Sequence, residues 1–74
     1  MRTVLLKAHI DDVRSHIDEH LPGAMLRYNK TKRMTAVQHP ELSELEVGEI
    51  ENIARVHALP YVCCVNLRPF SRSA

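Results

Sequence analysis

The sequence predicts an α+β fold, a ferredoxin-like βαββαβ sandwich in which two helices cover one face of a four-stranded antiparallel sheet. Segments with strand-like and helix-like periodicity follow one another in the order strand, helix, strand, strand, helix, strand. Turn-forming residues separate them. Because each β-α-β connection should be a right-handed crossover, both helices are expected on the same side of the sheet. We expect one domain over residues 1–68, followed by a flexible polar tail at 69–74.

The first part of the chain predicts one strand and one helix. Residues 3–8 are β-branched and aliphatic, as strands prefer. Asp11 or Asp12 is then the expected N-cap, because a short carboxylate can accept from the free amides of the first helical turn. Pro22 and Gly23 should end the helix. Its apolar stripe has spacings of three and four residues: Ile10, Val13, Ile17 and Leu21.

The middle of the chain predicts a β-hairpin, in which residues 24–28 and 33–38 flank the turn 29–32. Its register has two alternatives, and a shift by one residue moves every side chain to the other face. An even loop would place Leu26 on the same face as Thr35. We expect the odd loop, because it separates polar from apolar side chains better. It groups six residues on the core face: Ala24, Leu26, Tyr28, Met34, Ala36 and Gln38.

The strongest local signal is a helix start at residues 42–47. Ser43 and Glu46 have the spacing of a capping box, and the apolar residues at the two ends of the segment have that of a hydrophobic staple. The helix is expected to continue to about Ala58. Gly48 costs about 1 kcal/mol relative to Ala inside a helix, and close packing on the sheet would explain its presence.

The last predicted strand, 61–68, contains the two cysteines of the chain. Neighbouring strand residues point to opposite faces, so Cys63 and Cys64 are not a disulfide framework. We expect two reduced cysteines, with Cys63 in the core and Cys64 on the other face. No apolar stretch approaches a membrane span or a signal peptide. A cytoplasmic location without a membrane partner is therefore expected.

Acidic and basic residues occupy different parts of the sequence. All nine acids lie in or just before the two helical segments, with only two of the ten bases. Helices on one side of the sheet would therefore produce an acidic face and a basic face. The candidate partner-binding residues of the acidic helix face are Glu44, Glu46, Glu49 and Glu51. Those of the basic face are Lys7, Arg27, Lys30, Lys32, Arg33 and Arg68.

The sheet face without helices is the expected location of these bases, with Leu5, Val37 and Val62 as an apolar centre. Such a patch suits an acidic partner or a second copy of the chain. Nucleic acid is the alternative partner, through this face and the hairpin 27–33. The central strands lack the aromatic side chains on which RNA-recognition domains stack bases, so this alternative has weaker support.

Enzyme and metal chemistry are disfavoured by the sequence. His16 and His20 have the i, i+4 spacing that can chelate zinc, but zinc sites use three or four protein ligands. No metal or cofactor is therefore expected. His57 is assigned to the core or to the end of the second helix. His9 is the best-placed general base, yet no Ser or Cys nucleophile lies near it in the sequence. A core of this size also seldom contains a deep substrate pocket.

The expected function is that of a small, non-catalytic, cytoplasmic binding protein. It would act as a regulator or stoichiometric inhibitor on a protein partner through its charge-segregated faces, and an origin in a phage or mobile element is expected. A homodimer through the open sheet face is a further expectation. The alternative is a nucleic-acid-binding protein that uses the basic sheet face and the hairpin.

Overall fold

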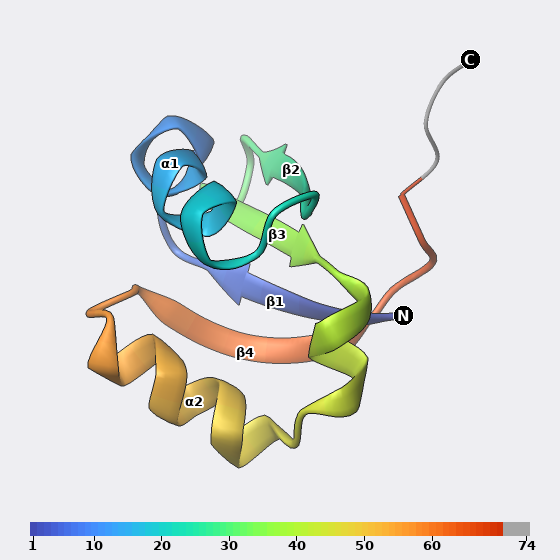
Figure 1. Cartoon of the computed structure of the whole chain (residues 1–74). Helices are drawn as coiled ribbons and strands as arrows, with labels where there is room; N and C mark the ends of the chain where they lie inside the picture. The colour runs from blue at the N-terminus through green and yellow to red at the C-terminus, as the bar shows by residue number, and fades with distance from the viewer. Residues whose placement is uncertain (71–74) are drawn as a thin grey trace.

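The structure is a computed structural model that describes residues 1–70. The described part contains four strands, two α-helices and one 3-10 helix (Figure 1). In chain order these are β1 (Arg2–Leu6), α1 (Ile10–His20), β2 (Met25–Asn29), β3 (Met34–Gln38), η1 (Pro40–Glu44), α2 (Val47–Val56) and β4 (Tyr61–Asn66). The predicted α+β class and the order of strands and helices are confirmed. Residues 71–74 of the predicted tail lie outside the described residues.

The four strands form one antiparallel sheet in the order β2-β3-β1-β4. The two α-helices pack beside different edge strands, α1 beside β2 and α2 beside β4 (Figure 1). The central strands β1 and β3 therefore lie between the two edges of the sheet at which the helices pack. Within residues 1–70, neither helix combines the length and the apolar character that crossing a membrane requires.

The core lies where the central strands meet the helices. Val4 and Leu6 of β1 and Val37 of β3 are buried, and they form one cluster with apolar side chains of α1, η1 and α2. Burying one such side chain contributes about 1.5–3 kcal/mol. The helical and 3-10 members of the cluster are Val13, Ile17, Leu42 and Ile50.

The hairpin turn fixes a register different from the predicted one. Asn29 pairs with Met34, so the loop between them has an even number of residues. The Asn29 side-chain oxygen accepts hydrogen bonds from the backbone N–H of Thr31 at 3.0 Å and of Lys32 at 3.1 Å. Arg33 completes the turn with a left-handed φ of 54°. Such Asn-stabilised turns satisfy backbone donors locally, which the polarity pattern of the strands does not reveal.

This even loop reverses the predicted sides of β3. Leu26 pairs with Val37, and Thr35 and Val37 are 0% and 1% exposed. The buried Thr35 hydroxyl is satisfied, because it donates to the Ala8 carbonyl at 2.7 Å. The predicted odd loop was therefore wrong. Three residues assigned to the core face lie on the opposite face: Met34, Ala36 and Gln38.

A bulge in β4 also reverses the predicted positions of the cysteines. Leu5 pairs with Cys63 but Leu6 pairs with Tyr61, so one extra residue is inserted in β4. Cys64 consequently pairs with Val4 and packs against the core, while Cys63 shares the face of Leu5. Both cysteines are free and half-buried. The prediction of Cys63 in the core was wrong because the alternation of a regular strand does not include a bulge.

Histidines cap two of the helical segments. The His9 ring nitrogen Nδ1 accepts from the Asp11 amide at 3.1 Å, and His9 is the N-cap of α1. His39 Nδ1 accepts from the Glu41 amide at 3.1 Å and begins η1. The predicted caps Asp11 and Asp12 were wrong, since both lie in the first turn. Carboxylates there still interact favourably with the helix dipole.

The predicted capping box of the second helix is absent, and the segment divides in two. Leu42 is buried in η1, the chain is extended at Leu45, and α2 begins at Val47. Glu46 is the N-cap but makes no side-chain hydrogen bond there. Burial of Leu42 in the core requires the chain to turn before α2, and this tertiary contact overrides the local signal. Ala58 lies beyond the end of α2, with a left-handed φ of 55°.

The chain beyond β4 closes over one end of the opposite sheet face. Gln38 is 0% exposed, and its amide nitrogen donates to the Thr3 hydroxyl and to the Arg68 carbonyl, each at 3.0 Å. Its side-chain oxygen accepts from the Phe70 amide at 2.8 Å. The Arg27 guanidinium lies 5.1 Å from the centre of the Phe70 ring. Phe70, the second residue of the tail predicted at 69–74, therefore packs against the body of the protein.

Candidate functional site: a groove with three histidines

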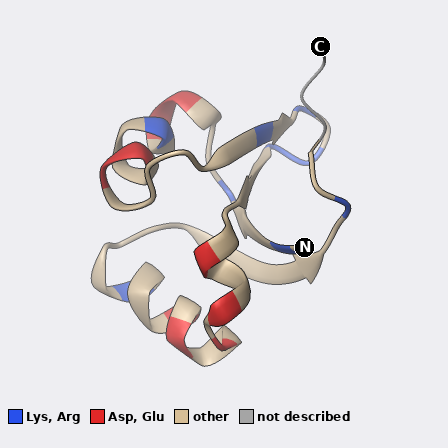
Figure 2. Ribbon diagram, turned by 45° about the vertical axis from the view of Figure 1, so that its right-hand side comes forward, with Lys and Arg blue, Asp and Glu red and all other residues tan. Residues whose placement is uncertain are grey.

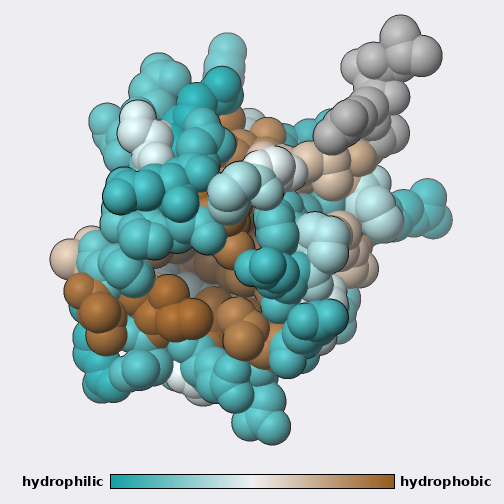
Figure 3. All heavy atoms as spheres, in the orientation of Figure 1, coloured by the Kyte–Doolittle hydropathy of each residue, from teal (hydrophilic) through white to brown (hydrophobic). Residues whose placement is uncertain are grey.

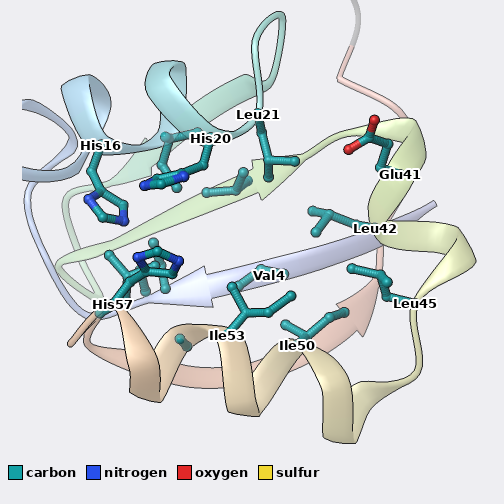
Figure 4. Close-up of a pocket in the computed structure, with 15 residues that line it drawn as sticks. Val4, His16, His20, Leu21, Glu41, Leu42, Leu45, Ile50, Ile53 and His57 are labelled. Carbon is teal, nitrogen blue, oxygen red and sulfur yellow. The ribbon is translucent and has the colours of Figure 1, made fainter.

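A groove of about 330 Å³ separates α1 from α2. Figure 3 shows it as a hollow with an apolar interior, and Figure 4 shows the side chains that line it. Its floor comes from the central strands, and the helices supply its two walls, because they pack over opposite edges of the sheet. The sequence suggested little room for such a concavity, but the separation of the helices creates it. Most lining residues are apolar, among them Val4, Leu6, Ile17, Leu21, Val37, Ile50 and Ile53.

One end of the groove is closed by η1. Leu42 and Leu45 close the space between the helices there (Figure 4). Arg2 reaches across and donates to the Leu42 carbonyl at 3.3 Å. The His39 ring nitrogen Nε2 lies 3.0 Å from the Pro22 carbonyl and must donate to it, because Nδ1 already accepts a hydrogen bond. This end is therefore joined both by apolar packing and by hydrogen bonds.

Three histidines meet at the other end of the groove. His16 and His20 extend from α1, and His57, the C-cap residue of α2, faces them across the groove (Figure 4). The ring centres are 4.5 Å apart for His16 and His20, 5.1 Å for His16 and His57, and 4.4 Å for His20 and His57. One nitrogen from each ring lies within 4.8 Å of the other two. These distances bring three potential metal ligands together.

The His16 ring contains a buried nitrogen without a partner. Within residues 1–70, Nε2 of His16 makes no hydrogen bond although it is shielded from solvent. An unsatisfied buried polar atom costs about 1–3 kcal/mol. The fold tolerates this cost at the histidine end of the groove, whereas both ring nitrogens of His39 have partners at the closed end.

Carboxylates lie on both helices that wall the groove. Asp12 lies four residues before His16 and Glu19 three residues after it, so both lie beside it on the surface of α1. On α2, Glu49 lies four residues before the groove-lining Ile53 and is its neighbour on the helix surface. The two basic residues of the helices are not among the groove-lining residues. Arg55 lines a second depression, and Arg14 lies four residues before Asp18 and is therefore its neighbour on α1. Figure 2 shows the acids gathered on the helical segments. At the closed end, Glu41 also lines the groove.

The four acids predicted as partner-binding residues are all exposed but do not form one surface. Glu44 belongs to η1 and Glu46 precedes α2, four residues before the buried Ile50. Glu49 lies on α2, four residues before the groove-lining Ile53. Glu51 lies on the opposite side of that helix, where it lines the second depression.

Tyr61 lies beside Glu51 in this second depression. Its hydroxyl donates to the Cys64 sulfur at 3.4 Å. Burial raises the pKa of Tyr61 above its ordinary value, and the hydrogen bond to Cys64 adds to this effect. The tyrosine is therefore a neutral, packed side chain at this position and not a charged group of the acidic surface.

The six bases predicted as one face are dispersed. Lys30, Lys32 and Arg33 lie in the hairpin turn, and Lys7 follows β1 at the same end of the sheet. Arg27 lies on the sheet face opposite Leu26 and Val37, against Phe70. Arg68 lies beyond the end of β4, at the other end of the sheet. A continuous basic face from all six residues is not formed.

The predicted apolar centre of the open face was also wrong. Val37 is buried against the helices, and Val62, at 44% exposure, lies at the bulge of β4. Leu5 does lie on the open face, where its cross-strand partners are Ala36 and Cys63. Both errors follow from the two register changes described above.

Sequence reasoning missed the meeting of His57 with the i, i+4 pair. The sequence did contain a feature that could have indicated this meeting, because His57 lies at the end of the second predicted helix. Two helices on the same sheet can bring their facing residues together, but the spacing of the helices decides whether they meet. The chain matches no protein-family model, and no curated protein or solved structure is significantly similar to it.

Proposed function

We propose that this protein is a small, non-catalytic binding protein on a ferredoxin-like βαββαβ scaffold with both helices on one face. The strand order β2-β3-β1-β4 supports this scaffold. The common cluster of α1 and α2 side chains with Val4, Leu6 and Val37 supports it as well. The protein would act stoichiometrically, as a regulator or inhibitor of a protein partner.

The observation that carries the proposal is an apolar groove with an acidic rim. Ile53, which lines the groove, is 44% exposed, and Val56, three residues further along α2, is 71% exposed, although both are large apolar side chains. Both belong to α2, and Glu49 adjoins them on the same side. An apolar surface with a polar rim is typical of protein interfaces.

The partner that fits this groove is a polypeptide segment with apolar side chains on one face and Lys or Arg beside them. An amphipathic helix lays apolar anchors into a groove in this way. Each anchor that becomes buried contributes about 1.5–3 kcal/mol. The carboxylates of the rim, such as Glu41 and Glu49, would raise the association rate and favour basic over acidic segments.

The basic residues give less support to the alternative function, nucleic-acid binding. Four of the six predicted bases cluster around the hairpin turn, while Arg27 and Arg68 lie apart from them. The phosphate backbone of a nucleic acid would therefore contact one small basic site. This site is formed by Lys7, Lys30, Lys32 and Arg33. Binding of an RNA or DNA oligonucleotide would support this alternative function.

The proposal is tested with two synthetic helical peptides that share one leucine stripe. One has Lys and the other Glu at the flanking positions, and binding is followed by NMR chemical shifts. The Lys peptide is expected to bind and to shift groove resonances. Glu49→Lys should weaken its binding about fivefold, as an exposed ion pair contributes up to about 1 kcal/mol. Ile53→Ser should weaken it about tenfold through lost apolar burial.

Glu51→Lys is the matched control, since it makes the same charge change on the opposite side of α2. It should leave binding nearly unchanged. The groove proposal is wrong if Glu49→Lys and Glu51→Lys have equal effects, or if the two peptides bind equally. Binding of an RNA or DNA oligonucleotide that falls steeply with salt, with shifts at residues 30–33, would support the alternative function instead.

A further inference from the structure

We propose that His16, His20 and His57 form a zinc-binding site that joins α1 to α2. The site lies at the end of the groove away from η1 (Figure 4). It does not depend on the proposed peptide partner, because metal binding requires only these three side chains. The sequence disfavoured zinc for lack of a third ligand, and the third ligand is what the fold supplies.

The distances between the rings are close to those that zinc requires. With Zn–N bonds of 2.0–2.1 Å in a tetrahedron, ligand nitrogens lie about 3.3 Å apart. Here one nitrogen of each ring lies within 4.8 Å of the others. His20 is exposed and so has room to turn. A contraction of about 1.5 Å, by small rotations of the rings, would complete the geometry.

The chemistry of the site also fits a cation. Nε2 of His16 is buried without a partner among the described residues, and a metal bond would satisfy it. Asp12 and Glu19 lie beside His16 on α1, so nearby charges favour a cation. The bases of the two helices, Arg14 and Arg55, lie on other sides of their helices.

The ligand set selects the class of metal. Imidazole nitrogens suit zinc, copper, nickel and cobalt, whereas magnesium and calcium require oxygen ligands. Three protein ligands leave one position of a tetrahedral zinc for water or another small ligand. A bound zinc would also join helices that otherwise pack over opposite edge strands, and it should therefore stabilise the fold.

Zinc binding is measured by titration calorimetry on the metal-stripped full-length chain, without any peptide. We expect one zinc per chain. His16→Gln, His20→Gln and His57→Gln should each weaken binding by at least about tenfold, since even changes outside the ligand set cost that much at zinc sites. Circular dichroism checks that each variant is folded.

His39→Asn is the matched control, because it removes an imidazole while Asn still caps a helix well. Cys63→Ser/Cys64→Ser is a second control, which removes the thiols. Both should retain zinc binding. The inference is overturned if the triple variant His16→Gln/His20→Gln/His57→Gln binds zinc as the natural chain does, or if the natural chain binds none.

Cobalt(II) gives a readout of geometry. Tetrahedral cobalt absorbs visible light far more strongly than octahedral cobalt, so the natural chain should develop an intense spectrum that His57→Gln lacks. Azide should change this spectrum if one coordination position is open. Zinc at a hundred times its Kd should raise the Tm by about 10 °C or more. A weak, octahedral cobalt spectrum would contradict the three-histidine site.

Discussion

The two ends of the groove use the same residue type in opposite ways. At the closed end, His39 caps η1 through Nδ1 and is hydrogen-bonded to the Pro22 carbonyl through Nε2. At the other end, the buried Nε2 of His16 has no partner within the described residues. At the closed end, the polar groups of His39 form hydrogen bonds that join segments of the fold. The other end holds an unsatisfied nitrogen near His20 and His57, as a binding site would.

Because the two ends of the groove differ in this way, mutations at one end should change the stability of the fold and mutations at the other should change metal binding. Leu42, Leu45 and the Arg2 contact make one end part of the core. Removing a side chain there should leave a cavity, whereas removing the exposed His20 at the other end should leave mainly solvent. Mutations at the two ends should therefore differ in the property that they change.

The largest effect is expected for Leu42→Ala at the closed end. Leu42 is 5% exposed, and removal of a buried leucine costs about 2–5 kcal/mol. His57→Ala, in metal-free protein, should cost less than about 1 kcal/mol, because it breaks no hydrogen bond between described side chains. Urea denaturation measures both. Equal costs would show that the histidine end is as much a part of the stability core as the closed end.

A smaller effect is expected for Gln38→Leu, on the far side of the sheet from η1. Its amide group satisfies the Thr3 hydroxyl, the Arg68 carbonyl and the Phe70 N–H. Loss of these partners should destabilise the protein by about 1–3 kcal/mol. The Phe70 amide should also lose its protection from hydrogen exchange. Zinc affinity should stay unchanged; a loss would mean that the two regions are coupled.

The smallest effect, a gain in stability, is expected for Gly48→Ala in α2. The predicted close packing of Gly48 on the sheet is absent, since within residues 1–70 no atom outside its chain neighbours and the backbone of α2 lies within 4 Å of an added Cβ. Alanine should therefore stabilise α2 by about 0.5–1 kcal/mol. Gly23→Ala is the control with the opposite sign, because Gly23 has a left-handed φ of 82°. Thermal unfolding distinguishes the two; a destabilised Gly48→Ala would indicate an unrecognised contact on that side of α2.

The sequence predicted the features that depend on near neighbours. The apolar stripe of α1 contains Val13 and Ile17, which are buried as expected, and β1 lies within the strand predicted at residues 3–8, apart from Arg2. The pairing of His16 with His20 follows from the helix period alone. The placement of all nine acids in or beside helical segments is likewise a property of the sequence.

The sequence patterns failed at two places, one because of a contact between distant segments and one because of a local turn. Burial of Leu42 overrode the capping signal of Ser43 and Glu46. The Asn29 turn selected the even register, which moved Val37 into the core. The Leu42 contact joins segments far apart in the sequence, whereas the Asn29 turn is local but is not revealed by the polarity pattern of the two strands.

The sequence by itself determined the helical periodicity, the charge segregation and the pair formed by His16 and His20. These depend on backbone geometry, which repeats over a few residues. Only the tertiary structure decided that His57 joins this pair, that β4 bulges at Val62 and that a groove separates the helices. Each of these depends on how segments some 30 to 60 residues apart pack against one sheet, which shape and burial determine and local periodicity does not.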